Sequence, residues 1–294
     1  MANIIDGKIR ADKILSDLKE DISNLQEVPR LAIFLASDDY ESEVFVNLKM
    51  KKAHEIGMET KLYQFPLATS SEDLTRELRK LRSNVGVHGA LLQLPMFDHL
   101  RDFRKQIVDA IPYDKDADGL TAYQQGKSCH LHEDSIPPAT VEAVLECLDE
   151  CFEQNLTWQN ITSGNDELDI LKSQNVVIVN NSNLIGKPLA AILSSLGATV
   201  TIANEFTNEL GYFTSRADIL ITATGKTNII NHEMVKEGAI VIDVTSTKVN
   251  DQILGDVIQD EALLNKVSYI TPVPGGVGPL TVACLLRNVI RLCS

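Results

Sequence analysis

The sequence has few of the features that mark secreted, metal-stabilised or nucleic-acid-binding proteins. Its five cysteines are odd in number and include no CxxC pair and no Cys/His ligand spacing, so we expect reduced thiols and no bound metal. Basic residues are scarce: 27 Lys and Arg against 41 Asp and Glu give a net charge of -14, the opposite of the balance usual in nucleic-acid-binding proteins. No apolar run approaches the roughly 18 residues of a membrane span, and the first residues lack the apolar segment of a secretory signal. These absences predict a cytoplasmic protein with no nucleic-acid or membrane partner.

What is present is enough apolar sequence for two α/β domains. The 294 residues exceed most single cores, and 44% of them are hydrophobic. In the first half, short apolar runs alternate with segments of helical periodicity, which is typical of a parallel sheet covered by helices. The predicted strands are 31–36, 61–65 and 87–94, and the predicted helices are 8–25, 42–57, 70–84 and 139–154.

The second half repeats this alternation after a polar stretch at 155–172, which we interpret as a hinge with a loop insertion. The predicted elements are strands at 175–179, 198–203, 218–223 and 239–244, and helices at 187–196 and 278–294. This rhythm is typical of a doubly wound nucleotide-binding sheet. The sequence therefore predicts an N-terminal α/β catalytic domain, formed by 1–150 with the C-terminal helix 278–294, and a Rossmann-like doubly wound domain formed by 151–277.

A candidate phosphate-binding turn lies at 180–188 (NNSNLIGKP), between a predicted strand and a predicted helix. Such a turn can bind a pyrophosphate through backbone N–H groups and the helix dipole. Of the usual GxGxxG pattern only Gly186 and the short side chain of Ser182 remain, so an ordinary strand–helix turn is the alternative. Glu205 follows Gly186 at about the 20-residue spacing of a ribose-binding acid in dinucleotide folds, although a solvated loop glutamate is also compatible.

The next two predicted strands end in small polar residues, at 224–226 (TGK) and 245–247 (TST). Ligands of doubly wound sheets bind at the carboxyl ends of the strands, and small residues allow a nicotinamide to approach closely. Plain turn chemistry is the alternative for both clusters.

Polar side chains also stand out in the first half. Lys49 lies one helical turn after Phe45, so the two share a helix face. Gln93 stands inside an apolar strand, where a buried amide needs a partner. That partner is either an ordinary core group or, at a functional site, a lysine or a substrate.

Two loops of unusual composition complete the candidate regions. The segment 112–120 (PYDKDADGL) has alternating aspartates like the start of a calcium loop, but Gln125 stands where that loop has its bidentate glutamate. A carboxylate beside a glycine turn, binding the N–H groups of a heterocycle, is the interpretation that we favour. The segment 271–279 (TPVPGGVGP) predicts a rigid loop that exposes its backbone to a flat ligand.

Together these segments resemble the methylenetetrahydrofolate dehydrogenase/cyclohydrolase family over nearly the whole chain. The matching segments are 4–8 (IIDGK), 42–49, 88–95 (HGALLQLP), 115–120 (KDADGL), 137–148, 182–188, 217–226, 238–244, 255–256 (GD) and 270–288. The last block, ITPVPGGVGPLTVACLLRN, is highly specific to the family. The resemblance implies oxidation of 5,10-methylenetetrahydrofolate with a nicotinamide cofactor, then hydrolysis of the methenyl product. It further implies a homodimer that acts in one-carbon metabolism, including purine biosynthesis.

The resemblance also implies residue roles. The family's catalytic lysine, glutamine and pterin-binding aspartate fall on Lys49, Gln93 and Asp118. The implied folate-binding residues, beginning with the aromatic that stacks on the folate rings, are Phe45, Leu92, Leu94, Pro272, Gly275 and Gly276. The implied cofactor-binding residues are Asn180, Asn181, Ser182, Gly186, Glu205, Gly225 and Ser246. Binding in this way brings the methylene carbon to C4 of the nicotinamide.

The sequence departs from the family pattern at both predicted sites. Phe45 replaces a tyrosine, which keeps stacking but removes a hydroxyl from the hydrolase site. The family's G-R-S is Asn180-Asn181-Ser182 here, and a serine after the second strand is Glu205. One positive charge for a 2′-phosphate is thus lost and one negative charge is added, which favours NAD, although NADP is the family default.

Other functions remain open from the sequence alone. Retention of Lys49, Gln93 and Asp118 favours the bifunctional enzyme over a dehydrogenase without cyclohydrolase activity. The incomplete glycine turn would suit a non-catalytic protein that binds folate or nucleotide. A two-domain dehydrogenase acting on another substrate, such as shikimate, would not explain the block at 270–288.

Overall fold

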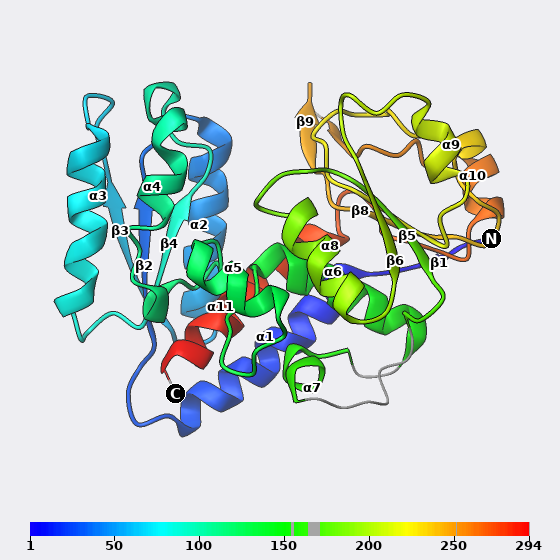
Figure 1. The fold of residues 1–294 in the computed structure, drawn as a ribbon. Coiled ribbons are helices and arrows are strands. Elements are labelled where there is room, and N and C mark those ends of the chain that lie inside the picture. The colour runs from blue at the N-terminus through cyan, green and yellow to red at the C-terminus, as the bar shows by residue number, and fades with distance from the viewer. Residues whose placement is uncertain (154–155, 164–170, 251, 294) are drawn as a thin grey trace. The chain divides into compact units, whose positions relative to one another are not determined.

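The computed structural model describes residues 1–153, 156–163, 171–250 and 252–293. The chain forms two compact units (Figure 1). The three-stranded unit comprises Asp12–Lys127 and Val282–Ser294, and the six-stranded unit comprises Met1–Ala11 and Ser128–Thr281. Residues 1–11 and 128–150 thus cluster with the second sheet, whereas the sequence grouped them with the first. The functional domain boundaries drawn from the sequence remain a prediction.

The three-stranded unit is built on a parallel sheet in the order β3-β2-β4. Its elements are α1 (Gly7–Asn24, which begins in the other unit), β2 (Arg30–Leu35), α2 (Tyr40–Glu55), β3 (Glu59–Gln64), α3 (Ser71–Arg79), η1 (Lys80–Ser83), β4 (Gly89–Gln93), η2 (Asp98–Phe103), α4 (Arg104–Val108), η3 (Tyr113–Lys115), α5 (Ala122–Cys129, which ends in the other unit) and most of α11 (Val277–Cys293). Figure 1 shows α2 and α3 flanking this sheet. The central strand β2 is buried at every position after Arg30, because helices cover both faces.

Local signals set the ends of the helices. Asp39 caps α2 by accepting a hydrogen bond from the Ser42 amide at 2.9 Å, and Ser70 caps α3 through the Asp73 amide at 3.1 Å. Gly57 follows α2 with a φ of +89°, a left-handed conformation that glycine adopts without steric cost. These ends confirm the predicted Ser70 start and the predicted helix stop at Gly57.

The six-stranded unit contains a parallel sheet in the order β1-β11-β8-β7-β5-β6. Its elements are β1 (Asn3–Ile4), α6 (Ala139–Phe152), α7 (Trp158–Thr162), β5 (Asn175–Val179), α8 (Gly186–Ser195), β6 (Thr199–Ala203), α9 (Leu210–Thr214), β7 (Ile219–Thr222), η4 (His232–Met234), β8 (Ile240–Asp243), β9 (Thr247–Val249), β10 (Gln252–Leu254), α10 (Glu261–Lys266) and β11 (Tyr269–Ile270). β5 pairs with β6 on one side and β7 on the other. The strand order therefore reverses at β5, which is the switch point of a doubly wound sheet and confirms the predicted class.

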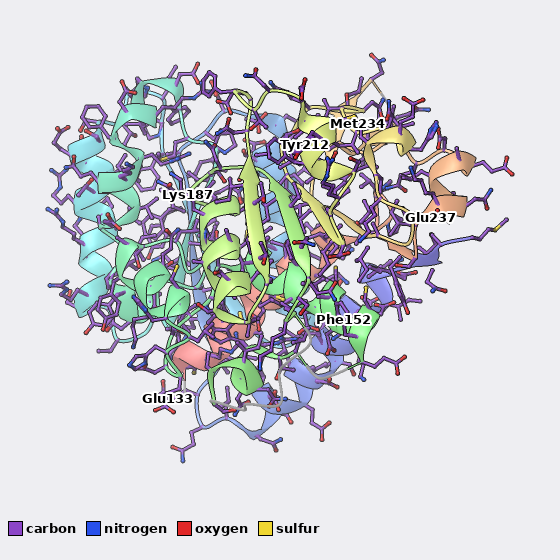
Figure 2. All side chains as sticks on the ribbon, turned by 45° about the vertical axis from the view of Figure 1, so that its right-hand side comes forward. Glu133, Phe152, Lys187, Tyr212, Met234 and Glu237 are labelled. Atoms are coloured by element: carbon purple, nitrogen blue, oxygen red, sulfur yellow. The ribbon has the colours of Figure 1, made fainter. Side chains whose placement is uncertain are left out.

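Apolar side chains from several elements close the six-stranded unit. One buried cluster joins strands β5, β7 and β8 to residues such as Ile230, Val257 and Leu263. On the surface, Tyr212 of α9 and Met234 of η4 lie close together (Figure 2). A Cβ on Gly211 would lie 3.5 Å from the Met234 side chain, which is ordinary van der Waals contact, so a larger residue would also fit there.

The polar stretch at 155–172 is not a simple loop in its described part. Residues 158–162 form α7, and Trp158 is only 2% exposed. Its indole N–H donates to the Ser135 carbonyl at 3.1 Å, which satisfies the one polar group of a large buried side chain. The predicted loop is therefore wrong for 158–162, and the remainder of the predicted insertion lies partly outside the described residues.

Candidate functional site

A polar cluster gathers at the carboxyl end of β4 in the three-stranded unit. Lys49 of α2 donates from Nζ to Oε1 of Gln93 at 2.9 Å. The Gln93 amide in turn donates to the Leu94 carbonyl at 2.8 Å, and the side chain is 8% exposed. The predicted need of Gln93 for a partner is thus met by a lysine, with both ends of the amide engaged.

Burial shifts the charge states of Lys49 and Asp118 towards their neutral forms. Desolvation lowers the pKa of the Lys49 amine below its ordinary value, and the negative charge of Asp118 opposes the shift. Desolvation likewise raises the pKa of Asp118, and the positive charge of Lys49 opposes it. A lowered pKa makes the neutral amine easier to form, and general acid–base catalysis by a lysine needs that proton-accepting form.

The loop that carries Asp118 is fixed by its neighbours. Lys115 is buried, and its Nζ donates to the Val87 carbonyl at 2.7 Å. The Ala117 amide donates to the Ala90 carbonyl of β4 at 3.1 Å, and Asn288 of α11 donates to the Ala117 carbonyl at 3.0 Å. These bonds place Asp118 beside the sheet edge rather than in a free loop.

Asp116 closes the same loop and was not among the predicted site residues. Its carboxylate is fully buried and accepts a hydrogen bond from the Thr121 amide at 2.7 Å. Desolvation, with a smaller contribution from the charge of Asp118, raises the pKa of Asp116 to about 6. Its other oxygen has no hydrogen-bond partner among the described residues. The alternating aspartates could have indicated this residue, but only the fold shows that Asp116 faces inward while Asp118 is partly exposed.

The described residues contain no group of three or more His, Cys, Asp or Glu side chains placed to hold a metal ion. Asp116 is instead used to close the turn. No helix of the described ranges has the length and apolarity needed to cross a membrane.

The predicted folate-binding residues of this unit lie in three different environments. Phe45 is 42% exposed on α2, one turn before Lys49, so its ring is available to a ligand. Leu94 is partly buried beside the core. Leu92 is 3% exposed and belongs to the hydrophobic core between the sheet and α3. Its side chain is used in packing, so a role of Leu92 in substrate binding remains a prediction.

The other predicted folate-binding residues form a constrained loop in the six-stranded unit. The Gly276 amide donates to the Pro272 carbonyl at 2.9 Å, and Gly275 has a φ of +109°. The Lys8 amide of α1 donates to the Gly275 carbonyl at 3.1 Å. A Cβ on Gly7 would lie 1.9 Å from the Gly276 carbonyl oxygen, so only glycine allows this contact. The first turn of α1 therefore fixes the loop at 271–276.

The candidate nucleotide turn follows β5 at the switch point. The side-chain oxygen of Asn180 accepts bonds from the Ser182 amide at 2.8 Å and the Gly186 amide at 3.0 Å. The Ser182 hydroxyl accepts a bond from the Ile185 amide at 3.2 Å. A Cβ on Gly186 would lie 1.9 Å from the Asn180 carbonyl oxygen, which explains the one retained glycine. The turn is thus closed by its own side chains.

This closure bears on the predicted binding of a pyrophosphate by backbone N–H groups of the turn. The amides of Ser182, Ile185, Gly186 and Lys187 all donate within the turn, and the binding of a pyrophosphate there remains a prediction. The dipole of α8 remains as a source of attraction for an anion. Lys187, labelled in Figure 2, is exposed at the start of α8 and donates to the Asn183 side chain at 2.8 Å.

The remaining predicted cofactor residues lie at the carboxyl ends of neighbouring strands. Asn181 is exposed in the turn after β5, and Glu205 is exposed after β6, where the Asn204 side chain closes the turn by accepting a bond from the Phe206 amide at 2.9 Å. Gly225 and Ser246 are exposed after β7 and β8, and the Gly225 amide donates to the Thr245 hydroxyl at 3.1 Å. The fold thus brings these residues to one edge of the sheet. Their contact with a cofactor remains a prediction.

Comparison with known proteins extends these observations. Residues 5–118 match the family model described as tetrahydrofolate dehydrogenase/cyclohydrolase, catalytic domain, and residues 164–294 match the NAD(P)-binding domain of the same family. The bifunctional protein FolD of Methanosarcina barkeri (strain Fusaro / DSM 804) is 39% identical over 293 residues, which span 98% of this chain and 95% of the relative.

Solved structures are similar over the full length. The crystal structure of the bifunctional enzyme FolD from Campylobacter jejuni gives a TM-score of 0.88 at 32% identity, covering 100% of this chain and 99% of that chain. The FolD structure from Trypanosoma brucei, complexed with NADP cofactor and inhibitor, gives a TM-score of 0.87 at 28% identity, covering 99% and 97%.

Proposed function

The chain belongs to the tetrahydrofolate dehydrogenase/cyclohydrolase family, and we propose that it oxidises 5,10-methylenetetrahydrofolate and hydrolyses the resulting 5,10-methenyltetrahydrofolate. The observation that carries this proposal is the hydrogen bond between Lys49 and Gln93, with Asp118 acting on the same amine. A glutamine that only packs in the core and a lysine that only faces solvent would not need a hydrogen bond to each other. Here they place a proton-transfer group at the end of a strand, where ligands of parallel sheets bind.

In the cyclohydrolase step, water adds to the electrophilic methenyl carbon and the bond from that carbon to N5 then breaks, giving 10-formyltetrahydrofolate and a proton. Lys49 assists the loss and transfer of protons, since its lowered pKa allows the neutral amine to form. Gln93 orients the amine by accepting its hydrogen bond. Asp118 binds the pterin N–H groups and limits the shift in the Lys49 pKa.

In the dehydrogenase step, a nicotinamide cofactor bound by the six-stranded unit would supply the acceptor for a hydride from the methylene carbon. The cofactor supplies this chemistry, and the protein contributes binding and orientation. Phe45 offers an exposed aromatic face for stacking, and the constrained loop at 271–276 offers backbone groups. Both reactions serve one-carbon metabolism, including the supply of formyl groups for purine biosynthesis.

We propose NAD as the preferred cofactor. Asn181 supplies no positive charge to a 2′-phosphate, and Glu205 adds a negative charge at the end of β6, where the ribose of a dinucleotide binds in such folds. Fold likeness does not decide this point, because the Trypanosoma brucei relative has the same fold and is complexed with NADP.

We also propose a cytoplasmic homodimer. Strand β6 is one edge of the six-stranded sheet, and Ile202 on it is 40% exposed. An edge strand with exposed apolar residues can pair with a second copy of itself. Light scattering after size-exclusion chromatography should give the mass of two chains for the wild type. The variant Ile202→Lys should lower the measured mass towards that of one chain.

A dehydrogenase without cyclohydrolase activity is the second candidate, because Phe45 lacks the hydroxyl of the family tyrosine. The deciding experiment supplies 5,10-methenyltetrahydrofolate without any nucleotide and follows its absorbance. Loss of the methenyl signal well above the buffer rate supports the bifunctional enzyme. A signal that decays at the buffer rate, with dehydrogenase activity present, establishes the second candidate. Folate binding with neither activity would leave a binding protein.

A further inference from the structure

Two buried carboxylates lie beneath the loops that follow β7 and β8 in the six-stranded unit. Asp243 is the last residue of β8 and is 1% exposed. Asp256 lies between β10 and α10 and is 0% exposed. Burying two carboxylates costs free energy unless they accept hydrogen bonds, so the groups that donate to them indicate their role.

The carboxylate of Asp243 connects three segments of the chain. One oxygen accepts a bond from the Thr245 amide at 3.0 Å, and the other accepts one from the Val257 amide at 2.9 Å. Thr245 links Asp243 to the loop after β7, because its hydroxyl accepts a hydrogen bond from the Gly225 amide at 3.1 Å. A Cβ on Gly255 would lie 2.1 Å from the Asp243 carboxylate, so a glycine is needed beside it.

Asp256 holds the loop after β7 from the other side. One of its carboxylate oxygens accepts a bond from the Thr224 amide at 2.7 Å, and its backbone carbonyl accepts one from the Ile230 amide at 3.0 Å. The second carboxylate oxygen has no hydrogen-bond partner among the described residues. Thr224 is thereby fixed directly, and Thr245 is fixed through Asp243.

The two carboxylates are also coupled electrostatically. Desolvation raises the pKa of Asp243 to about 6, and the charge of Asp256 contributes in the same direction. Thr222 of β7 is the strand neighbour of Asp243, and the Thr271 hydroxyl after β11 accepts a bond from the Asp243 amide at 2.8 Å. Asp256 is the ionisable group whose charge acts on Asp243.

We propose that Asp243 and Asp256 are positioning residues for the nicotinamide half of the cofactor, which hold the loops at 224–226 and 245–247 in the conformation that receives it. The inference rests on the proposed function, since it assumes that the six-stranded unit binds a dinucleotide. Charged acceptors hold backbone amides more tightly than neutral ones, so the loops are held best when Asp243 is ionised. Affinity for the dinucleotide therefore falls as the pH drops through about 6.

The test measures the dissociation constant of NAD and of NADP for the wild type, Asp243→Asn and Asp256→Asn between pH 5 and pH 8. Asp243→Asn weakens binding by about tenfold at pH 7.5, the scale of a lost charged hydrogen bond, and removes the change through pH 6. Asp256→Asn lowers the pKa of Asp243 by removing a like charge. In this variant the pH-dependent loss of dinucleotide affinity therefore moves to lower pH. A purely structural role would not move the pH profile in these two different ways.

Two controls keep the result interpretable. Hydrolysis of 5,10-methenyltetrahydrofolate needs no nucleotide, so it stays within twofold of the wild type if the variants are folded. If Asp243→Asn does not fold, Thr245→Val removes the acceptor for the Gly225 amide alone, and we expect severalfold weaker binding with the pH profile retained.

The outcomes separate the two levels of inference. If both carboxylate variants have the same dissociation constants as the wild type at every pH, the positioning role is overturned and the proposed function stays intact. A wild type that binds neither NAD nor NADP overturns the proposed function, and the positioning role with it.

Discussion

The two sites of this protein differ in how they relate to the family pattern. In the three-stranded unit the family's polar residues are retained, and the fold joins Lys49 to Gln93 beside Asp118. In the six-stranded unit the family's arginine and serine are replaced by Asn181 and Glu205, and both replacements are exposed. The proposed site of proton transfer is thus kept, while the surface proposed to distinguish NAD from NADP is altered.

Under the proposed function, the residues for proton transfer and the residues for cofactor choice lie in different units of the fold. The proposed role of Lys49 depends on its hydrogen bond to Gln93 and on its burial, so we expect most substitutions there to alter the reaction. Asn181 and Glu205 are exposed in the turns after β5 and β6, so we expect substitutions there to change the local charge and leave the core untouched. Both units nevertheless contain a fully buried aspartate with a pKa raised to about 6, Asp116 in one and Asp243 in the other.

The largest effect is expected from Lys49→Met. Removal of the amine should lower the cyclohydrolase rate by about a hundredfold or more, the usual contribution of a general acid–base group. The dehydrogenase rate should fall less, because hydride transfer belongs to the cofactor. Lys51→Met on the same helix is the matched control, since Lys51 is exposed, and both of its activities should equal those of the wild type. Equal loss of both activities in Lys49→Met would argue against a role in proton transfer.

A large effect is also expected from restoring the family residues at the two altered cofactor positions. Asn181→Arg combined with Glu205→Ser should raise the ratio of kcat/KM for NADP over NAD by about tenfold to a hundredfold, because one attraction is gained and one repulsion removed. Glu237→Ser removes an exposed charge elsewhere on the same unit and should leave the ratio unchanged. An unchanged ratio in the double variant would show that cofactor choice is made elsewhere.

A moderate effect, of opposite sign for stability and activity, is expected on acidification. Asp116 and Asp243 have folded pKa values above those of an unfolded chain, so the folded state binds protons more tightly between about pH 4 and pH 6. Each group should then add up to about 3 kcal/mol to the free energy of unfolding as the pH falls through this window. Dehydrogenase activity should fall over the same range.

Urea denaturation at pH 7 and pH 5 would measure the stability change, with initial rates taken on the same samples. Asp116→Asn should reduce the pH dependence of the folate KM, and Asp243→Asn that of the cofactor KM. Stability and activity falling together on acidification would contradict these assignments.

The smallest effect is expected from Phe45→Tyr. The added hydroxyl should raise the cyclohydrolase rate by about threefold while leaving dehydrogenase kinetics unchanged, because stacking is the same for both rings. Phe45→Leu removes the ring and should raise the folate KM in both reactions. A cyclohydrolase rate that does not respond to Phe45→Tyr would show that the hydroxyl is dispensable here.

The larger elements of the fold could be predicted because their patterns are local. Continuous apolar runs predicted β2, β4, β5, β7 and β8, which the structure confirms. The two-residue strands β1 and β11 were missed, since each exists only through pairing with a distant segment. The helix α7 was missed because its sequence is polar apart from Trp158 and Ile161, the two side chains that it buries.

The candidate site could be predicted only in part, for a similar reason. Gln93 was identifiable as a polar residue in an apolar strand, and the structure supplies its partner. Asp116, Asp243 and Asp256 were not identified, because their roles depend on backbone amides from separate segments. The aspartate inside the apolar run at 239–244 was the available signal for Asp243.

The most direct test follows the wild-type reaction with 5,10-methylenetetrahydrofolate in parallel assays with NAD and NADP, recording reduced cofactor and methenyl absorbance. The proposed combination of a retained proton-transfer site and an altered cofactor surface predicts a kcat/KM at least about tenfold higher with NAD, and a methenyl signal that does not persist. A kcat/KM at least as high with NADP, or a methenyl product that accumulates, would contradict this account.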